Sequence, residues 1–194
     1  MRIILVTGPA RSGKSEWAEM LAMHSQKAVI YVATAKVDST DAQWQSRIKK
    51  HRDRRPQNWR TWEIPDRLVD SINTAPQSSC ILVDSLGTWV ANRLEEDDST
   101  WENSVQNLCS SLTTDAPSQQ GGVALTAANI EIIFVAEETG WGVVPASASG
   151  RIFRDRLGNL VRRIGEIADT VYLITGGYAL NLTALGSRLP SLHE

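Results

Sequence analysis

The stretch GPARSGKS, at Gly8–Ser15, decides the fold. It fits the pattern G-x-x-x-x-G-K-[ST] at every fixed position, and it follows the continuous apolar run IILVT at Ile3–Thr7. Such a run is typical of a buried parallel strand, and the helical spacing that begins at Glu16 supplies the helix that the pattern requires. The alternative is a glycine-rich turn that matches by chance, and the flanking strand and helix argue against it.

The residue types of this loop suit a bound phosphate. Backbone amides must wrap the anion, so a side chain at Gly13 would obstruct its approach. The helix that follows directs its positive end at the same anion. We expect Lys14 to act as a catalytic residue that follows the β- and γ-phosphates, and Ser15 to offer its hydroxyl to Mg²⁺. The predicted nucleotide-binding loop comprises Gly8, Pro9, Ala10, Arg11, Ser12, Gly13, Lys14 and Ser15.

Apolar runs and helical patterns alternate along all 194 residues. We predict strands at 3–7, 28–34, 60–64, 80–86, 129–138 and 170–175. We predict helices at 16–24, 40–54, 65–72, 88–94, 101–112 and 151–169. Together with the loop, this alternation predicts a single α/β domain over 1–194, a P-loop NTPase with a mostly parallel sheet and helices on both faces. The stretch 113–128, rich in Thr, Ser, Gln and Gly, is expected to be a long mobile surface loop.

Composition limits the classes of function. The net charge of -2 and the pI near 6.0 argue against a dedicated nucleic-acid binder, which usually has a basic balance. Cys80 and Cys109 share no metal-type spacing, so we expect reduced, partly buried thiols. No segment approaches the length of a membrane span, and we expect a cytoplasmic protein.

An acid ends the apolar run CILVD, at Asp84. In parallel α/β sheets, ligands collect at the carboxyl ends of the strands. A carboxylate there is placed to hold Mg²⁺, directly or through water, whereas the alternative is an Asp that caps the next turn. These features define a class of protein and leave the reaction open.

The run RIKKHRDRRP, at Arg47–Pro56, contains six of the 20 Lys and Arg residues of the chain. If 40–54 is a helix, Trp44, Ile48 and His51 share one face at the spacing i, i+4 and i+7. A histidine on an apolar stripe is often a packed core residue, and that interpretation of His51 stays open.

The charges around His51 favour a catalytic interpretation. Arg47, Arg52, Arg54 and Arg55 disfavour a protonated imidazole, and the neutral imidazole is the nucleophilic form. The same arginines would grip a triphosphate and neutralise charge at a phosphorus under attack. The arrangement suits attack by His51 on the α-phosphate of a nucleotide, with pyrophosphate leaving and a nucleotidyl-histidine formed.

Five segments occur together in this order: GPARSGKS, YVATA, RIKKHRDRRPQNWRTWEIP, ILVDSLGTWVANRL and EETGWGVVP. They resemble the bifunctional adenosylcobinamide kinase / adenosylcobinamide-phosphate guanylyltransferase family of cobalamin biosynthesis. The resemblance implies a RecA-like fold and a homo-oligomer, a trimer. It also implies phosphorylation of adenosylcobinamide with ATP or GTP, followed by transfer of GMP from GTP to adenosylcobinamide-phosphate. In the family, a histidine at the position of His51 carries GMP covalently.

The resemblance also implies nucleotide contacts beyond the loop. These are Ala33, Thr34, Ala35, Arg52, Asp53, Arg54, Arg55, Glu63 and Asp84. A carboxylate at Glu63 can accept both N1–H and N2–H of guanine, and without the resemblance an exposed acid at a strand end would be the better interpretation. Trp141, which lies between glycines, is a candidate platform for the corrin ring, whereas Trp17, Trp44 and Trp89 are expected in the core.

Two other functions are consistent with the loop. One is a P-loop kinase of another small alcohol, in which His51 is structural. The other is a RecA-like ATPase whose basic helix grips nucleic acid, and the net charge of -2 argues against it. Binding to a polynucleotide with a steep salt dependence would support the second alternative.

Overall fold

The computed structural model describes residues 1–36, 46, 49, 52–113 and 129–189. The strands are β1 Arg2–Gly8, β2 Ala28–Ala33, β3 Arg60–Glu63, β4 Ser79–Asp84, β5 Glu131–Glu137, β6 Thr170–Thr175 and β7 Tyr178–Asn181. The helices are α1 Lys14–His24, α3 Leu68–Asn73, α4 Leu86–Ala91, α5 Asp98–Thr113, α6 Ala148–Ile167 and α7 Leu182–Leu185. This order confirms the predicted alternation of strands and helices.

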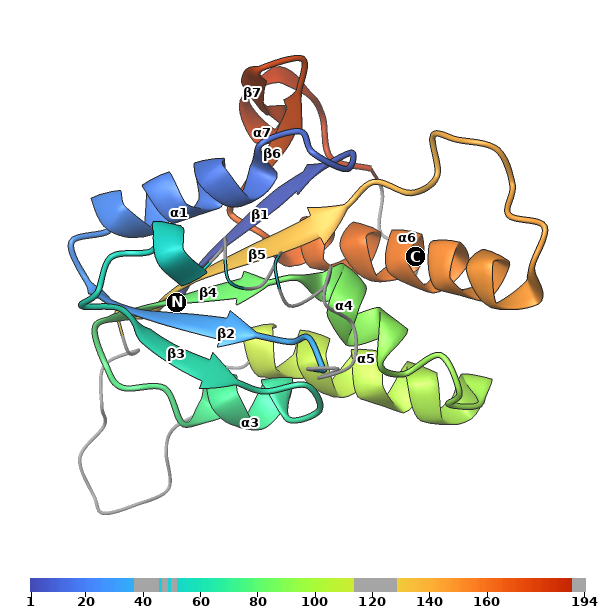
Figure 1. Cartoon of the computed structure of the whole chain (residues 1–194), viewed down its shortest axis with the longest axis horizontal. Helices are drawn as coiled ribbons and strands as arrows, with labels where there is room; N and C mark the ends of the chain where they lie inside the picture. The colour runs from blue at the N-terminus through green and yellow to red at the C-terminus, as the bar shows by residue number, and fades with distance from the viewer. Residues whose placement is uncertain (37–45, 47–48, 50–51, 114–128, 190–194) are drawn as a thin grey trace.

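The strands form one seven-stranded sheet in the order β3-β2-β4-β5-β1-β6-β7 (Figure 1). All neighbouring pairs are parallel except β6 and β7, which are antiparallel. The mostly parallel sheet is therefore confirmed. β5 lies between β1, which leads into the glycine-rich loop, and β4, which ends in Asp84.

Helices cover both faces of the sheet, as predicted. α1 packs on one face, and α3, α4, α5 and α6 pack on the other (Figure 1). Alternate residues of β1 serve the two faces: Ile4 and Val6 join the cluster under α1, while Ile3 and Leu5 join the other cluster. Burial on both sides explains why β1 reads as a continuous apolar run.

Two predicted boundaries around Asp84 are wrong. β4 ends at Asp84 and α4 already begins at Leu86, because Ser85 caps the helix. The Ser85 hydroxyl accepts from the backbone N–H of Thr88, and the Thr88 hydroxyl accepts from the backbone N–H of Ser85. This capping box has Thr88 in place of the usual Glu or Gln, so the S/T-x-x-E/Q pattern does not predict it. The N-cap of α4 is therefore Ser85, the residue after Asp84.

The predicted helix at 65–72 begins later than expected, at Leu68. Pro65 lies before it, and the carbonyl of Pro65 accepts from the side chain of Asn92 at 3.2 Å. The segment between β3 and α3 is thus tied to the residue that ends α4.

The C-terminal hairpin was not predicted from the sequence. Gly176 and Gly177 both have left-handed φ values, 59° and 82°, and they turn β6 back into β7. A two-residue turn with positive φ at both positions is the typical connection of a tight hairpin. The Gly-Gly pair between two apolar runs was therefore the available signal.

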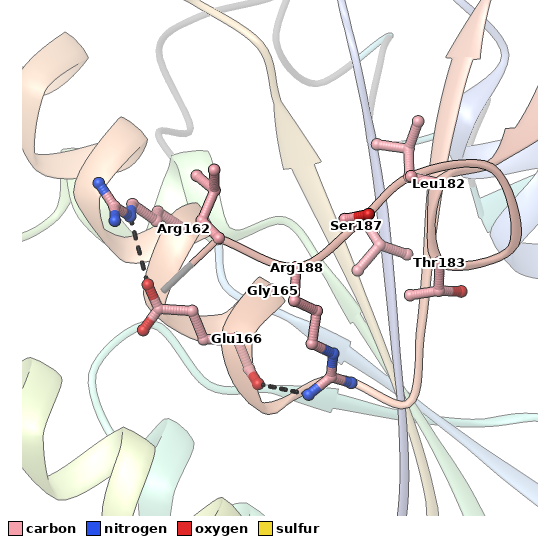
Figure 2. Close-up of a pocket in the computed structure, with 10 residues that line it drawn as sticks. Arg162, Gly165, Glu166, Leu182, Thr183, Ser187 and Arg188 are labelled. Atoms are coloured by element: carbon pink, nitrogen blue, oxygen red, sulfur yellow. Dashed lines mark hydrogen bonds and ion pairs between the residues drawn. The ribbon is translucent and has the colours of Figure 1, made fainter. Parts of the chain in front are cut away.

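After α7 the chain returns to the end of α6. Arg188 donates to the carbonyl of Glu166 at 3.1 Å (Figure 2). It also donates to the carbonyl of Ala168 at 2.8 Å, so it caps the last turn of α6. A cavity of about 300 Å³ lies beside it, and Arg162 and Leu182 are among its lining residues. This cavity borders Val171 near the start of β6, away from the strand ends that carry the predicted site.

Several predictions fall outside the described residues. Trp44, Arg47, Ile48 and His51 are among them, as is almost all of the predicted loop at 113–128. The described residues of the predicted helix at 40–54 are helical, at 46, 49 and 52–54. Within the described parts of the chain, no helix has the length and apolar character needed to span a bilayer.

Candidate active site

The glycine-rich loop depends on two glycines for different reasons. A Cβ added to Gly8 would lie 2.4 Å from the carbonyl oxygen of Ile174 and 2.8 Å from Ser12 Oγ. Gly8 is thus required by the close approach of β1 to β6. Gly13, the N-cap of α1, has a left-handed φ of 93°, a conformation that costs glycine little and other residues more.

Lys14 and Ser15 begin α1 directly after this loop. The Lys14 side chain is buried, and its Nζ donates to the carbonyl of Pro9 at 3.3 Å, so the ammonium lies over the loop. The hydroxyl of Ser12 is buried and has no hydrogen-bond partner among the described residues. A cation and amides at a helix N-terminus form an anion site.

The strand register brings the other predicted residues to the same edge. Ala33 lies opposite Glu63 on one side and opposite Asp84 on the other. Gly8 lies opposite Glu137 of β5. Because these strands are parallel, their carboxyl ends share one edge of the sheet, and the loop starts at that edge (Figure 1).

Asp84 is held by a tyrosine that the sequence analysis did not single out. The Tyr31 hydroxyl donates to Asp84 Oδ2 at 2.8 Å, and the guanidinium carbon of Arg55 lies 3.4 Å from the centroid of the Tyr31 ring. Burial, together with the charge of Asp84, raises the pKa of Tyr31 above its ordinary value, so Tyr31 stays a neutral donor. Tyr31 thus contacts both residues: Arg55 lies over the face of its ring, and Asp84 accepts from its hydroxyl.

Arg54 has a different set of partners. Its guanidinium contacts Glu16 Oε1 at 3.1 Å and Glu19 Oε1 at 2.8 Å, both on α1. Glu19 is buried, and Glu16 is exposed. Arg54 therefore joins its segment of the chain, here called the basic segment (Arg52–Arg55), to α1. Its neighbours Arg52 and Asp53 are exposed.

Thr34, directly after β2, joins the carboxyl end of that strand to the residue that follows β4. It is fully buried, its hydroxyl donates to the carbonyl of Ser85 at 2.7 Å, and it accepts from the backbone N–H of Ser85 at 3.1 Å. The carbonyl of Thr34 accepts from Asn92 at 2.7 Å. The Thr34 side chain is thus engaged by the protein, while Ala33 and Ala35 on either side are half-buried.

Glu63 is exposed at the end of β3. It lines a cavity of about 470 Å³ with Trp62, Ile64 and Pro65 among its neighbours. The volume lies within the range of small-molecule pockets. Contact of Glu63 with guanine stays a prediction.

Glu137 lies at the same edge of the sheet and was not among the predicted site residues. It ends β5 as Asp84 ends β4, and a shared strand-end acid was the available signal. Burial raises the pKa of Glu137, and the charge of Asp84 acts in the same direction, while Lys14 and the hydroxyl of Ser85 oppose it. The next acid, Glu138, accepts from the Thr7 hydroxyl at 2.6 Å.

Trp17, Trp89 and the two cysteines lie as expected, Trp17 partly buried against the cluster under α1. Trp89 is 1% exposed and belongs to the core, whereas Trp141 is 63% exposed. Contact of Trp141 with a corrin ring stays a prediction. Both cysteines are free, and burial raises the pKa of the Cys80 thiol to about 11, so it is an inert core residue.

The fold is that of a P-loop NTPase of the RecA-like type. Its P-loop follows β1, an acid ends β4, and β5 lies between these two strands. Two solved structures share this fold. The protein PH0250 of Pyrococcus horikoshii OT3 matches with a TM-score of 0.54 and 8% identity, over 100% of this chain and 93% of that one. An ATPase from the type III secretion system of pathogenic bacteria matches with a TM-score of 0.52 and 12% identity, over 96% and 58%. At such identities the likeness shows the fold alone.

The chain belongs to the cobinamide kinase / cobinamide phosphate guanyltransferase family, whose model matches residues 4–182. The bifunctional adenosylcobalamin biosynthesis protein CobP of Pseudomonas aeruginosa is 35% identical over 179 residues, 92% of this chain and 95% of that protein. The corresponding protein CobU of Salmonella typhimurium is 33% identical over 188 residues, 93% and 99%. CobU of Escherichia coli is 32% identical over 189 residues, 93% and 99%. The resemblance seen in the sequence is therefore confirmed, and the chain is a member of a family of kinases and nucleotidyltransferases of cobalamin biosynthesis.

Proposed function

We propose that this chain catalyses two successive reactions at the strand-end edge. The first phosphorylates the aminopropanol hydroxyl of adenosylcobinamide with ATP or GTP. The second transfers GMP from GTP to adenosylcobinamide-phosphate and gives adenosylcobinamide-GDP. The observation that carries the proposal is the meeting of the P-loop, Asp84 and Glu63 at one edge, in a chain of this family.

In the kinase reaction, Lys14 neutralises charge on the β- and γ-phosphates as the phosphoryl group moves. Mg²⁺ would be held by Ser15 in the first turn of α1 and by Asp84, which is half-buried at the end of β4. A hydroxyl and a carboxylate suit this ion, which is bound by few protein oxygens and completes its shell with phosphate and water. Bound there, Mg²⁺ would supply positive charge against the negative charge of the phosphates.

In the guanylyl transfer, the neutral imidazole of His51 attacks the α-phosphorus of GTP. A P–N bond forms, and the bond from the α-phosphorus to the leaving pyrophosphate breaks. The corrinoid phosphate then attacks the same phosphorus, and the P–N bond breaks. Arg52 and Arg55 would neutralise the triphosphate and Glu63 would bind guanine, while Arg54, through Glu16 and Glu19, holds the segment on α1.

Radiolabelling tests the histidine intermediate. GTP labelled at the α-phosphate is expected to leave acid-labile, base-stable label on the protein, whereas γ-labelled GTP leaves none. His51→Ala is expected to abolish this label and to retain kinase activity. His24→Ala is the matched control, since His24 lies at the exposed end of α1 and bonds the Met20 carbonyl.

Two outcomes would contradict the proposal. Label that persists in His51→Ala would mean that another residue carries GMP. Kinase activity on a small alcohol with no GMP transfer by the wild-type protein would favour the kinase alternative, in which His51 is structural.

We also propose that the protein works in the cytoplasm as a homo-oligomer, a trimer by resemblance. Large apolar side chains are exposed along the C-terminal segment, at Tyr178, Leu185 and Leu189. Patches of this kind often mark protein–protein contacts. The mass in solution tests the proposal, since a species of one 21.4 kDa chain at working concentration would contradict it.

A further inference from the structure

The strand between the P-loop strand and the Asp84 strand ends in Glu137. In the parallel register Glu137 lies opposite Gly8, the first residue of the loop, and Asp84 lies opposite Val135 of the same strand. Neighbouring strands are about 4.8 Å apart. Glu137 therefore lies at the end of β5, the strand between the P-loop on β1 and Asp84, the acid proposed to hold Mg²⁺.

The carboxylate of Glu137 is partly unused by the protein. Its Oε2 is buried and has no hydrogen-bond partner among the described residues. A Cβ on Gly87 would lie 2.0 Å from Oε2, so Gly87 is the residue that makes room for this carboxylate. Buried polar atoms normally have partners, and an unpaired one calls for an explanation such as a functional role.

The neighbouring acids differ in this respect. Glu138 Oε1 accepts from the Thr7 hydroxyl, and Asp84 Oδ2 accepts from the Tyr31 hydroxyl. Glu137 interacts with the hydroxyl of Ser85 and with the charge of Lys14, the residue proposed to follow the transferred phosphate, while its Oε2 stays unpaired among the described residues. A buried, unpaired carboxylate oxygen thus lies at the strand end next to the first residue of the P-loop.

We propose that Glu137 is the proton acceptor for the hydroxyl that is phosphorylated in the kinase reaction, an inference that rests on the proposed function. The hydroxyl oxygen attacks the γ-phosphorus and forms the new P–O bond. The bond between the γ-phosphorus and the β–γ bridging oxygen breaks, and its electron pair leaves with the nucleoside diphosphate. The hydroxyl proton passes to the Glu137 carboxylate and is later released to water.

The same acceptor has no part in the second reaction. In guanylyl transfer the final nucleophile is a phosphate oxygen that is already ionised, so no proton has to be removed from it. The two reactions therefore depend differently on Glu137, although they share the P-loop. This difference separates a proton acceptor from a residue that only shapes the nucleotide site.

The test is Glu137→Gln, which keeps the shape of the side chain and removes its basicity. We expect kcat of adenosylcobinamide phosphorylation to fall roughly 100-fold, a typical loss for general-base removal. Transfer of GMP from GTP to supplied adenosylcobinamide-phosphate is expected to stay within about twofold, because it needs no proton acceptor. Glu131→Gln is the matched control, since Glu131 is a buried acid at the opposite end of β5, paired with Arg2.

Gly87→Ala provides a second, independent variant. The added methyl displaces Oε2, so the kinase reaction is expected to slow and GMP transfer to persist. The double variant Gly87→Ala with Glu137→Gln is expected to be no slower than Glu137→Gln alone, because both act through one carboxylate.

Each result decides the inference. A Glu137→Gln protein that phosphorylates adenosylcobinamide at the wild-type rate overturns it and leaves the proposed function intact. Loss of both reactions also overturns it, since Glu137 would then act on the nucleotide that the reactions share. A wild-type protein that lacks either reaction contradicts the proposed function itself.

Discussion

The two halves of the candidate site are built in different ways. The phosphate half consists of the P-loop and the start of α1, where Gly8 is fixed by the Ile174 backbone and Lys14 is buried. The other half consists of the ends of β2 and β3 and the residues around Arg54 and Arg55, whose charged side chains are largely exposed. One half is made by the main chain, and the other is made by long side chains.

This difference has consequences for stability and for motion. A main-chain site is fixed as soon as the strands pair, because its shape follows from the register and the left-handed turn. Arg54 holds its half through an exposed ion pair with Glu16 and a partly buried one with Glu19. Exposed ion pairs contribute about 0–1 kcal/mol each. The side-chain half is thus the part that can adjust between two reactions.

The largest loss is expected from Lys14→Ala, which removes the ammonium group that lies over the loop of the phosphate half. Kinase activity should fall by roughly three orders of magnitude, as when a main electrostatic stabiliser of a transition state is removed. Phosphorylation of adenosylcobinamide measures it. Lys27→Ala is the control, because Lys27 lies just before β2 and bonds Asn129, away from the strand ends. An equal loss in both variants would contradict the role of Lys14.

An intermediate effect is expected from Gly8→Ala. The added methyl would lie 2.4 Å from the Ile174 carbonyl, so β1 and β6 must move apart. Overpacking of this kind costs about 1–3 kcal/mol, which lowers the melting temperature by several degrees in a chain of this size. Thermal unfolding measures it. Gly158→Ala is the matched control, because a Cβ at Gly158 on α6 meets nothing within 4 Å and Ala favours a helix, so the same methyl should stabilise.

The sequence predicted the main-chain half better than the side-chain half. The requirement for glycine at Gly8 and Gly13, and the cation at Lys14, follow from the physics of holding a phosphate, so residue type alone locates them. The continuous apolar runs likewise located β1 and β4, since both faces of the sheet are buried.

Long-range partners could not be predicted. Periodicity shows which face of an element is buried, and it does not show which residue lies across from it. The bond from Asn92 to Thr34 joins positions 58 apart, and the bond from Arg54 to Glu19 joins positions 35 apart. Contact of Thr34 and Arg54 with nucleotide, implied by the resemblance, stays a prediction, and the partners that their side chains have within the protein, Ser85 and Glu19 among them, were not predicted.

The smallest effect, and the sharpest test of the comparison, is expected from Arg54→Ala. If Arg54 holds its segment on α1, its loss should destabilise the protein by about 1 kcal/mol, because the buried Glu19 loses its partner. Guanylyl transfer should fall severalfold, since the basic segment is held less firmly on α1. The kinase reaction should change little, because the main-chain half is untouched.

Glu19→Gln separates the tether from a direct contact with nucleotide. Glu19→Gln leaves the charge of Arg54 in place and weakens the ion pair between Arg54 and residue 19. If Arg54 acts only by holding its segment on α1, Glu19→Gln and Arg54→Ala should lower the rate of guanylyl transfer by similar factors. The double variant should then be no worse than either single variant, as a thermodynamic cycle on the two residues would show. If Arg54→Ala instead raises KM for GTP while Glu19→Gln does not, Arg54 contacts the triphosphate. The side-chain half would then hold nucleotide with the same residue that joins it to α1.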